Sequence, residues 1–190
     1  GRARRLLAWG ALFWKHRVMG TPTVRLANIR DLSDAGPGLS AGVAYRSDAP
    51  LPGDEPPTGI AAWPPSPVVD LRGGGEKHDA HPLAGSARIV EIDLLAAANL
   101  AGGSSHTLGS LEELYALMIG PGAAPGLVDV VAQVARADAP VLVHCSAGKD
   151  RTGVSAALVL SLVGVDRDRV VADSPATEKH MAGVLGRMLG

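Results

Sequence analysis

Two short apolar runs, each beginning with a proline, place the strongest limit on how this chain can fold. Pro67–Leu71 reads PVVDL and Pro140–His144 reads PVLVH. Continuous apolar runs of this length are typical of strands buried in a parallel sheet. Parallel strands need helices to connect them and to cover the sheet, so the runs predict an α/β fold with a central, mainly parallel sheet flanked by helices.

The remaining strand and helix patterns agree with that fold class. Further β-type runs are Thr23–Leu26, Val43–Arg46 and Arg88–Leu94. Helical patterns cover Ser110–Ile119, Leu127–Ala137, Thr152–Val163, Asp166–Ala172 and Thr177–Leu189. The first of these helices has a serine cap and an acidic first turn, and the third is apolar almost all round, as in a central buried helix. Loops rich in glycine and proline separate the elements at Ala49–Pro67, Gly73–Ser86 and Ala101–Gly109.

The composition excludes several classes of protein. A hydrophobic fraction of 46% and 19% charged residues exclude a wholly disordered chain, and 190 residues suffice for one domain with a core. A net charge of −1 provides no general attraction for nucleic acid, so no such partner is expected. The single cysteine excludes an internal disulfide framework and a cysteine-based metal cluster.

A metal could in principle bind the loop with Glu76, His78, Asp79 and His81. The adjacent glycines favour a solvated loop instead, so we expect no metal and no other cofactor.

The first 20 residues form a basic amphipathic segment that we separate from the domain predicted for residues 21–190. Basic residues at positions 2, 4, 5 and 15 to 17 flank the apolar stretch Leu6–Trp14. This stretch is shorter than the roughly 20 residues that span a bilayer, and it lacks the cleavage site of a signal peptide. Two interpretations stay open: a helix packed on the domain, or a peripheral membrane contact through residues 2–17. The single thiol is compatible with a cytoplasmic protein and with a secreted one.

The only cysteine of the chain, Cys145, lies directly after the run Pro140–His144. A tight polar loop follows it and leads into a helix predicted from about Arg151. Ligands of open α/β sheets bind at the carboxyl ends of the strands, and the N-terminus of a helix attracts anions. Cys145 therefore lies where the helix dipole and backbone N–H groups favour negative charge, which predicts a nucleophilic thiolate at neutral pH.

The loop after Cys145 has the composition of a phosphate-binding site. The amides that can converge there belong to Ser146, Ala147, Gly148 and Lys149. Gly148 allows the chain to turn back on itself, and the fork of Arg151 can hold two phosphate oxygens in a plane, which a lysine cannot do. The hydroxyl of Thr152 can donate to the thiolate. A phosphate held in this way, with the sulfur in line behind phosphorus, suits a phosphocysteine intermediate.

HCSAGKDRTG, residues 144–153, resembles the His-Cys-x5-Arg-Ser/Thr motif of cysteine-dependent protein tyrosine phosphatases. Its Gly-Lys-Asp-Arg-Thr-Gly form resembles the atypical bacterial branch, whose members act on phosphotyrosine, sometimes on phosphoserine or phosphothreonine, and on phosphoinositides. Three shorter matches occur in the same order as in that branch, namely Asn28–Leu32, Tyr45–Ser47, and Asp70–Arg72 with Glu76. The resemblance covers about residues 24 to 180.

The resemblance implies a cysteine-dependent phosphatase that hydrolyses phosphomonoesters, above all protein phosphotyrosine, through a phosphocysteine intermediate. It places the general acid at Asp150. Asp93, at the end of the run Arg88–Leu94, is the second candidate for this role, and Asp79 is a distant third. The resemblance also links Lys149 to phosphoinositides, so the expected partners are a phosphorylated protein or a phospholipid.

Some features leave other interpretations open. Ser174–Pro175 stands where the family usually has an aromatic residue, and the family's further C-terminal helices are expected to be absent. His144 is expected to orient the loop rather than to act as a base, and Arg46 and the pair Arg72 and Glu76 are expected to buttress the site through ion pairs. The rival functions are a rhodanese-like sulfurtransferase, a non-catalytic phosphate-binding module and a membrane-attached interaction protein.

Overall fold

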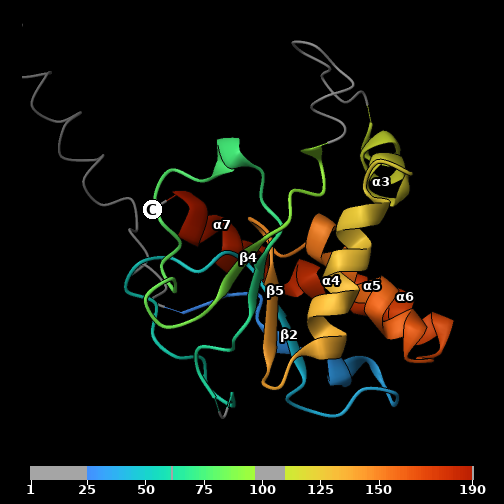
Figure 1. Cartoon of the computed structure of the whole chain (residues 1–190), viewed down its shortest axis with the longest axis horizontal. Helices are drawn as coiled ribbons and strands as arrows, with labels where there is room; N and C mark the ends of the chain where they lie inside the picture. The colour runs from blue at the N-terminus through green and yellow to red at the C-terminus, as the bar shows by residue number, and fades with distance from the viewer. Residues whose placement is uncertain (1–24, 61, 97–109, 190) are drawn as a thin grey trace, which may run out of the picture.

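The computed structural model of the chain describes residues 25–60, 62–96 and 110–189; the N-terminal segment 1–20 and the loop predicted at Ala101–Gly109 lie outside these ranges. Within them, five strands form one sheet in the order β1-β2-β5-β3-β4 (Figure 1). Their bounds are Arg30–Asp31 for β1, Ala44–Ser47 for β2, Val68–Asp70 for β3, Ile89–Glu91 for β4 and Val141–His144 for β5. The strands β2, β5, β3 and β4 are parallel, and β1 pairs antiparallel with β2 at the edge. The predicted α/β fold with a mainly parallel sheet is confirmed.

The two apolar runs that begin with proline form the centre of this sheet, as predicted. Every residue of β3 and β5 is buried, and β5 pairs with β2 on one side and with β3 on the other. The register places Ser47, His144 and Asp70 next to one another where these three strands end. The carboxyl edge of the sheet therefore brings three segments of the chain together beside Cys145.

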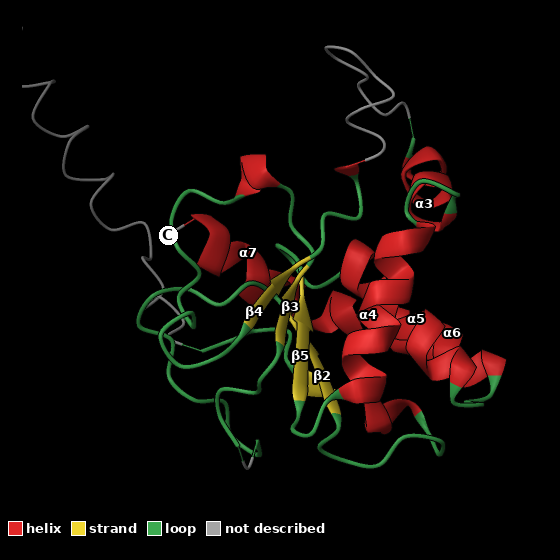
Figure 2. Cartoon of the chain, viewed as in Figure 1, coloured by secondary structure: helices red, strands yellow, loops and turns green. Residues whose placement is uncertain are grey.

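The described helices lie on both sides of the sheet. Their bounds are Leu111–Ile119 for α3, Ala124–Arg136 for α4, Asp150–Leu162 for α5, Arg167–Ala176 for α6 and Met181–Leu189 for α7, with 3₁₀ helices η1 at Leu32–Ala35, η2 at Gly74–Glu76 and η3 at Thr177–His180. Figure 2 shows α3 to α6 on one side of the sheet and α7 on the other. Val130 of α4 and Leu160 of α5 pack with Val69 and Val143 of the sheet in the main core. Among the described residues no single helix is long and apolar enough to cross a membrane, and α3 and α4 meet that test only as a pair bent by 66°.

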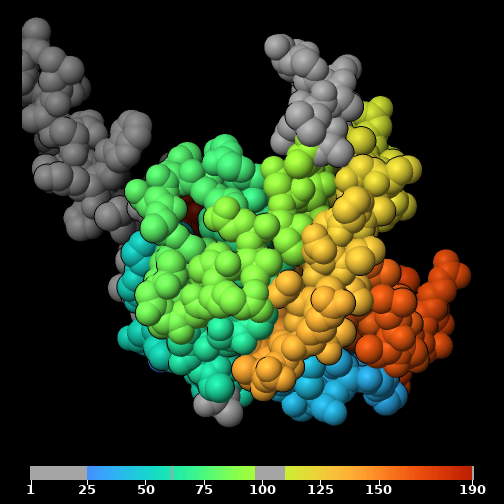
Figure 3. Space-filling view, in the orientation of Figure 1, coloured from blue at the N-terminus to red at the C-terminus, as the bar shows by residue number. Residues whose placement is uncertain are grey.

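The opposite face of the sheet is covered largely by loops. Tyr45, Val68 and Leu142 are buried there beneath partly buried side chains that include Trp63 and Leu83. In Figure 3 the surface on this side is formed mainly by the cyan and green segments, which carry the loops between β2 and β4. Helices α3 to α6 thus cover one face, and on the other side proline-rich loops complete the cover together with α7.

Several element boundaries differ from the sequence-based expectation. The described part of the strand predicted at Thr23–Leu26 is not in a strand, and the strand found further along, β1, has only two residues. A strand of this length is too short to show a period in the sequence. The helix α4 begins earlier than predicted, at Ala124, because Pro125 is compatible with a first helical turn. The helix α5 begins at Asp150 and not at Thr152, so the last part of the polar loop is already helical.

Candidate active site

The residues of the predicted phosphate-binding loop lie together at the carboxyl end of β5. Cys145 is 3% exposed and follows β5 directly, before α5 begins. Two backbone hydrogen bonds join neighbouring segments to this turn: the Ala49 amide donates to the Ser146 carbonyl and the Leu71 amide to the His144 carbonyl, both at 2.9 Å. The strand, loop and helix expected around the thiol are therefore present.

The loop carbonyls are held by side chains from β2 and from the segment before β1. Asn28 Nδ2 donates to the carbonyls of Ala147 (3.1 Å) and Gly148 (3.2 Å), and Arg46 Nη2 donates to that of Gly148 (2.8 Å). In a planar trans peptide the N–H points away from the C=O. Because Asn28 and Arg46 hold the loop carbonyls, the N–H groups of the same peptides point away from these two side chains. Within the described part of the chain, no hydrogen bond uses the amide N–H groups of residues 146–149. The loop is thus a set of free donors that suits an anion.

Gly148 permits this turn through its backbone conformation and its lack of a side chain. Its φ is +68°, in the left-handed region that favours glycine. A Cβ at this position would lie 2.3 Å from the Ser47 carbonyl oxygen. The loop therefore approaches the end of β2 more closely than a residue with a side chain allows.

Replacing Gly148 with alanine should destabilise the fold by more than about 2 kcal/mol, because the strain of a positive φ adds to the clash with Ser47. Gly164 is the matched control, since its φ is +82° but a Cβ there would meet nothing within 4 Å. Gly164→Ala should therefore cost only about 1 kcal/mol, from the backbone alone. Urea unfolding of both variants measures the difference, and equal losses would show that the clash is relieved at no cost.

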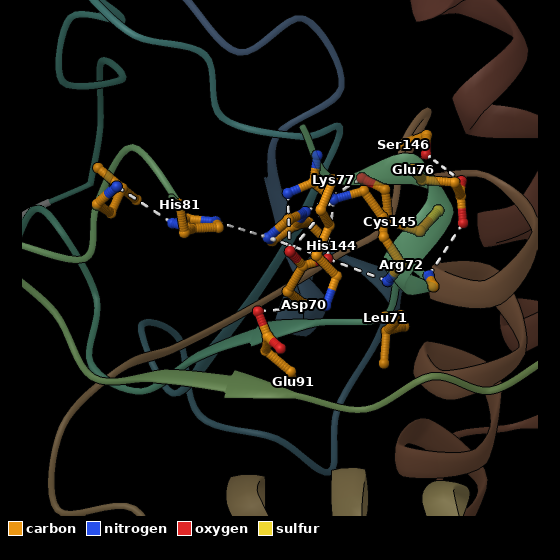
Figure 4. Close-up of polar contacts among 12 residues, drawn as sticks. Asp70, Leu71, Arg72, Glu76, Lys77, His81, Glu91, His144, Cys145 and Ser146 are labelled. Atoms are coloured by element: carbon orange, nitrogen blue, oxygen red, sulfur yellow. Dashed lines mark hydrogen bonds and ion pairs between the residues drawn. The ribbon is translucent and has the colours of Figure 1, made fainter. Parts of the chain in front are cut away.

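The guanidinium of Arg151 lies against the carboxylate of Glu76. Nη2 donates to Oε1 at 2.7 Å, Nη1 donates to Oε2, and Nη1 also donates to the Leu71 carbonyl at 3.3 Å. Glu76 accepts further hydrogen bonds from Ser146 Oγ at 2.7 Å, as Figure 4 shows, and from the Gly73 amide at 3.0 Å. The hydrogen bonds from Arg151 hold the pKa of Glu76 at about 2, although burial opposes them. Glu76 is therefore an anion that orients the fork of Arg151.

This pairing corrects the expectation that Arg72 and Glu76 form an ion pair with each other. Arg72 binds Asp70 instead: its Nη2 lies 2.7 Å from Oδ2, and its amide donates to Oδ1 at 3.0 Å. The two residues are close in sequence at the end of β3, so their side chains meet without help from the rest of the fold. The turn η2 carries Glu76 to the loop, where Arg151 is its partner.

One oxygen of the Asp150 carboxylate is held by two donors. Tyr115 Oη donates to Oδ1 at 2.9 Å, and Lys149 Nζ lies 2.5 Å from the same atom. Burial and the hydrogen bond to Asp150 raise the pKa of Tyr115 to about 12, so the phenol keeps its proton. Among the described residues no donor binds Oδ2, which leaves this oxygen available for proton exchange.

Sequence reasoning did not identify Tyr115 as a residue of the site. It belongs to α3, where Met118 follows it on the same helix face and is completely buried. That spacing is the one signal in the sequence that indicates that Tyr115 faces the domain.

The second candidate acid, Asp93, also lies near the loop. A Cβ on Gly73 would come within 2.9 Å of its Oδ2, so the carboxylate packs directly on this backbone. The pKa of Arg151 is raised mainly by its hydrogen bond to Glu76, and the charge of Asp93 makes a smaller contribution in the same direction. Asp79 is exposed in the loop after η2. The structure thus brings Asp150 and Asp93 toward Arg151 and leaves Asp79 at the surface.

A family model matches most of the chain, and two known phosphatases match shorter parts of it. A family model described as tyrosine phosphatase family matches residues 21–188. The chain belongs to the tyrosine phosphatase family. Triple specificity protein phosphatase PtpB of Mycobacterium tuberculosis is 71% identical over 34 residues, which are 18% of this chain and 12% of that protein. Tyrosine-protein phosphatase of Nostoc commune is 37% identical over 75 residues, 39% of this chain and 25% of that protein. The chain thus matches at most a quarter of the length of these two relatives.

In this member of the tyrosine phosphatase family, Asp173 links α6 to the loop. Its carboxylate accepts from Arg30 Nε at 2.9 Å and from the buried guanidinium of Arg46, which also holds the loop carbonyl of Gly148. Arg30 in turn donates to Asn28 Oδ1 at 2.6 Å. Arg46 therefore buttresses the site as expected, but sequence reasoning did not identify its acidic partner, Asp173.

Thr152 is completely buried in the first turn of α5. Its Oγ1 has no hydrogen-bond partner in the part of the chain that the structure describes, the sulfur of Cys145 included. Buried hydroxyl groups are seldom left unpaired. Donation from Thr152 to a charged sulfur at Cys145 stays a prediction.

His144 is completely buried and contacts the backbone of the loop. Its Nδ1 lies 3.1 Å from the Cys145 carbonyl oxygen. Burial lowers the pKa of His144 to about 4, although the charge of Asp70 opposes this effect. The ring is therefore neutral at pH 7, which agrees with the loop-orienting role expected for it.

The free energy of unfolding should fall as the pH decreases from about 6.5 to about 4. The unfolded chain protonates His144 near pH 6.5 and the folded protein only near pH 4, so the unfolded state binds more protons in this window. The loss from this residue is complete near pH 4 and amounts to about 3 kcal/mol. Urea unfolding at a series of pH values measures it. His144→Asn should flatten the slope, whereas His180→Asn, at an exposed position, should not; an unchanged slope in His144→Asn would assign the effect to other groups.

Proposed function

We propose that the chain is a cysteine-dependent phosphatase that hydrolyses phosphomonoesters through a phosphocysteine intermediate, with protein phosphotyrosine as its preferred substrate. The observation that carries the proposal is the loop itself, in which the buried Cys145 is followed by free amide donors and by Arg151. These donors suit a phosphoryl group, whose charge is spread over three oxygens. Membership of the tyrosine phosphatase family supports the same reaction.

The proposed reaction consists of two displacements at phosphorus. In the first, the sulfur of Cys145 forms a bond to phosphorus while the bond to the tyrosine oxygen breaks, and Asp150 gives a proton to the leaving oxygen. In the second, Asp150 takes a proton from a water molecule whose oxygen attacks phosphorus, and the bond between sulfur and phosphorus breaks. The products are the tyrosine phenol, inorganic phosphate and the regenerated thiolate.

The contacts of Arg151 support its role as the phosphate-binding fork. A guanidinium has five N–H groups. Glu76 and the Leu71 carbonyl take both N–H groups of Nη1 and one of Nη2. One edge of the fork, formed by Nε and the second N–H of Nη2, remains for two phosphoryl oxygens. Glu76 therefore orients Arg151 without competing for that edge.

The contacts of Asp150 support its role in proton transfer. Tyr115 and Lys149 both bind Oδ1, so the exchanging proton belongs on Oδ2. The same two donors hold the carboxylate in one orientation. Asp93 is the alternative acid, because it lies close enough to Arg151 for its charge to raise the pKa of that guanidinium.

We also propose a substrate range wider than phosphotyrosine, extending to phosphoserine, phosphothreonine and phosphoinositides. One similar protein, from Mycobacterium tuberculosis, is named a triple specificity protein phosphatase. Lys149, whose side chain is 35% exposed, adds a positive charge beside the loop that suits a headgroup with several phosphates. Residues 2–17, by their basic and apolar composition, are proposed to contact an anionic membrane.

Hydrolysis of 4-nitrophenyl phosphate in the presence of EDTA tests the phosphatase proposal against its rivals. The chain should release phosphate and, after rapid acid quenching with radiolabelled substrate, carry a phosphoryl group on Cys145. A sulfurtransferase would instead form thiocyanate from thiosulfate and cyanide, and a binding module would bind a phosphotyrosine peptide without releasing phosphate. Phosphate release without a labelled Cys145 would contradict the proposed intermediate. Values of kcat/KM for phosphotyrosine peptides, phosphoserine peptides and phosphoinositides then rank the substrates, and a higher value for a phosphoinositide would reverse the proposed preference.

A further inference from the structure

Two histidines form a hydrogen-bonded pair next to the candidate nucleophile. His81 Nε2 and His144 Nε2 are 3.0 Å apart (Figure 4). His144 is the last residue of β5, immediately before Cys145, and His81 lies in the loop between η2 and β4. The pair therefore connects the thiol-bearing loop with a segment that has no part in the mechanism above.

The groups at the two ends of the pair determine which nitrogens carry protons. At one end the Leu83 amide, which can only donate, lies 3.1 Å from His81 Nδ1, so the proton of a neutral His81 is on Nε2. At the other end the Cys145 carbonyl, which can only accept, lies 3.1 Å from His144 Nδ1, so the proton of a neutral His144 is on Nδ1. His81 Nε2–H then donates to His144 Nε2. One assignment satisfies all three contacts.

A charge on either ring breaks this chain of hydrogen bonds. A second proton on His144 would face the N–H of His81, and a second proton on His81 would face the amide of Leu83. Burial lowers the pKa of both rings, to about 4 for His144. Among the charged groups around the pair, Asp70 raises and Arg72 lowers the pKa of both rings, while Glu91 raises and Lys77 lowers that of His81. Both rings are therefore neutral at pH 7, as the assignment requires.

The same cluster has the composition of a metal site, but its geometry favours hydrogen bonding. Ligand atoms of Asp70, His81 and His144 lie within 4.8 Å of one another. The ring centroids of the histidines are 5.1 Å apart although their nitrogens are only 3.0 Å apart, so the rings meet end to end. Their lone-pair directions then do not converge on a third point where an ion could bind. The carboxylate of Asp70 is held by Arg72 at 2.7 Å.

We propose that His81 is a positioning residue for Cys145, an inference that rests on the proposed phosphatase function. His81 holds His144 in the tautomer with its proton on Nδ1, and that proton holds the Cys145 carbonyl. Because the peptide between Cys145 and Ser146 is planar, a held carbonyl also sets the direction of the Ser146 amide. This amide is one of the free donors of the loop. The segment with His81 thereby orients a phosphate-binding group that it does not touch.

Nitrogen-15 NMR of the imidazole rings tests this relay without reference to activity. At pH 7, His144 should have its proton on Nδ1 and His81 on Nε2. His81→Phe keeps a ring but removes the donor, so His144 should lose its single tautomer, whereas His81→Gln offers an amide N–H near the position of Nε2 and should preserve it. A proton on Nε2 of His144 in the wild type, or an unchanged tautomer in His81→Phe, would overturn the relay.

Alkylation and kinetics test the effect on the loop. Since Cys145 is the single cysteine, iodoacetate reports on it alone. Protection of Cys145 by inorganic phosphate should need about tenfold more phosphate in His81→Phe, and kcat/KM for 4-nitrophenyl phosphate should fall about tenfold, because the hydrogen bond that orients the amide donor is lost. His81→Gln should recover most of both values. His78→Phe, at an exposed position of the same loop, should behave as the wild type.

The outcomes separate the relay from the proposed function. If the wild type releases no phosphate but His81→Phe still weakens phosphate protection, the relay stands and the phosphatase proposal fails. If the wild type is active and His81→Phe matches it in protection and in kcat/KM, the positioning role of His81 is wrong.

Discussion

Replacing Cys145 with serine should abolish phosphate release from 4-nitrophenyl phosphate, to below about one ten-thousandth of the wild-type kcat. A serine hydroxyl stays protonated at neutral pH and is a far weaker nucleophile than a thiolate. The substitution changes the size of the side chain little, so the loop amides and Arg151 should keep their positions. Steady-state release of 4-nitrophenolate measures the loss of activity.

Binding provides the control for this variant. Cys145→Ser should still bind a phosphotyrosine peptide in a calorimetric titration, because it retains the phosphate-binding donors. Arg151→Lys is the comparison, since it keeps the charge but loses the planar fork, and it should weaken binding of the same peptide. Turnover by Cys145→Ser above about 1% of wild type would show that another group attacks phosphorus.

Replacing Asp150 with asparagine should lower kcat for a phosphotyrosine peptide by a factor of about 10² to 10⁴, the usual range for general acid–base catalysis. The loss on 4-nitrophenyl phosphate should be smaller. The phenol of tyrosine has a pKa of about 10, so its oxygen needs a proton to leave, whereas the nitro group stabilises 4-nitrophenolate without one. Asparagine can still accept the hydrogen bond from Tyr115, so the variant tests proton transfer and not orientation. The measurement is kcat on both substrates at several pH values.

Two further carboxylates serve as controls for this experiment. Asp168 occupies the first turn of α6 as Asp150 occupies that of α5, and Asp168→Asn should leave kcat within about twofold of wild type. Asp93→Asn decides between the two candidate acids. If the substrate-dependent loss appears in Asp93→Asn and not in Asp150→Asn, the proton is transferred by Asp93.

The sheet and the thiol loop could be predicted because their determinants are local in the sequence. Each of β3 and β5 begins with consecutive apolar residues, as expected where a strand has neighbours on both sides and is buried on both faces. Gly148 is needed for the same turn that brings Arg151 toward Cys145, so one short motif contains both the backbone requirement and the chemical groups. The two-residue β1 has no such local pattern, and the sequence did not predict it.

The partners of the site residues could not be predicted in this way. Glu76 and Arg151 are 75 positions apart, Tyr115 and Asp150 are 35 apart, and Asp173 lies 143 positions from Arg30. A charged side chain has many possible partners of opposite charge in the chain, and composition does not select among them. The expected pair of Arg72 and Glu76 was wrong for this reason.

The sequence by itself determined the order of strand, thiol, glycine turn, guanidinium and helix, because each of these is a property of adjacent residues. Only the tertiary structure decided which acids and histidines meet these groups. The register of β5 against β3 places His144 beside Asp70, and the turns after β3 bring Glu76 to Arg151 and His81 to His144. Such contacts depend on how strands pair and loops close. They join residues that are distant in the sequence, so they exist only once the sheet has assembled.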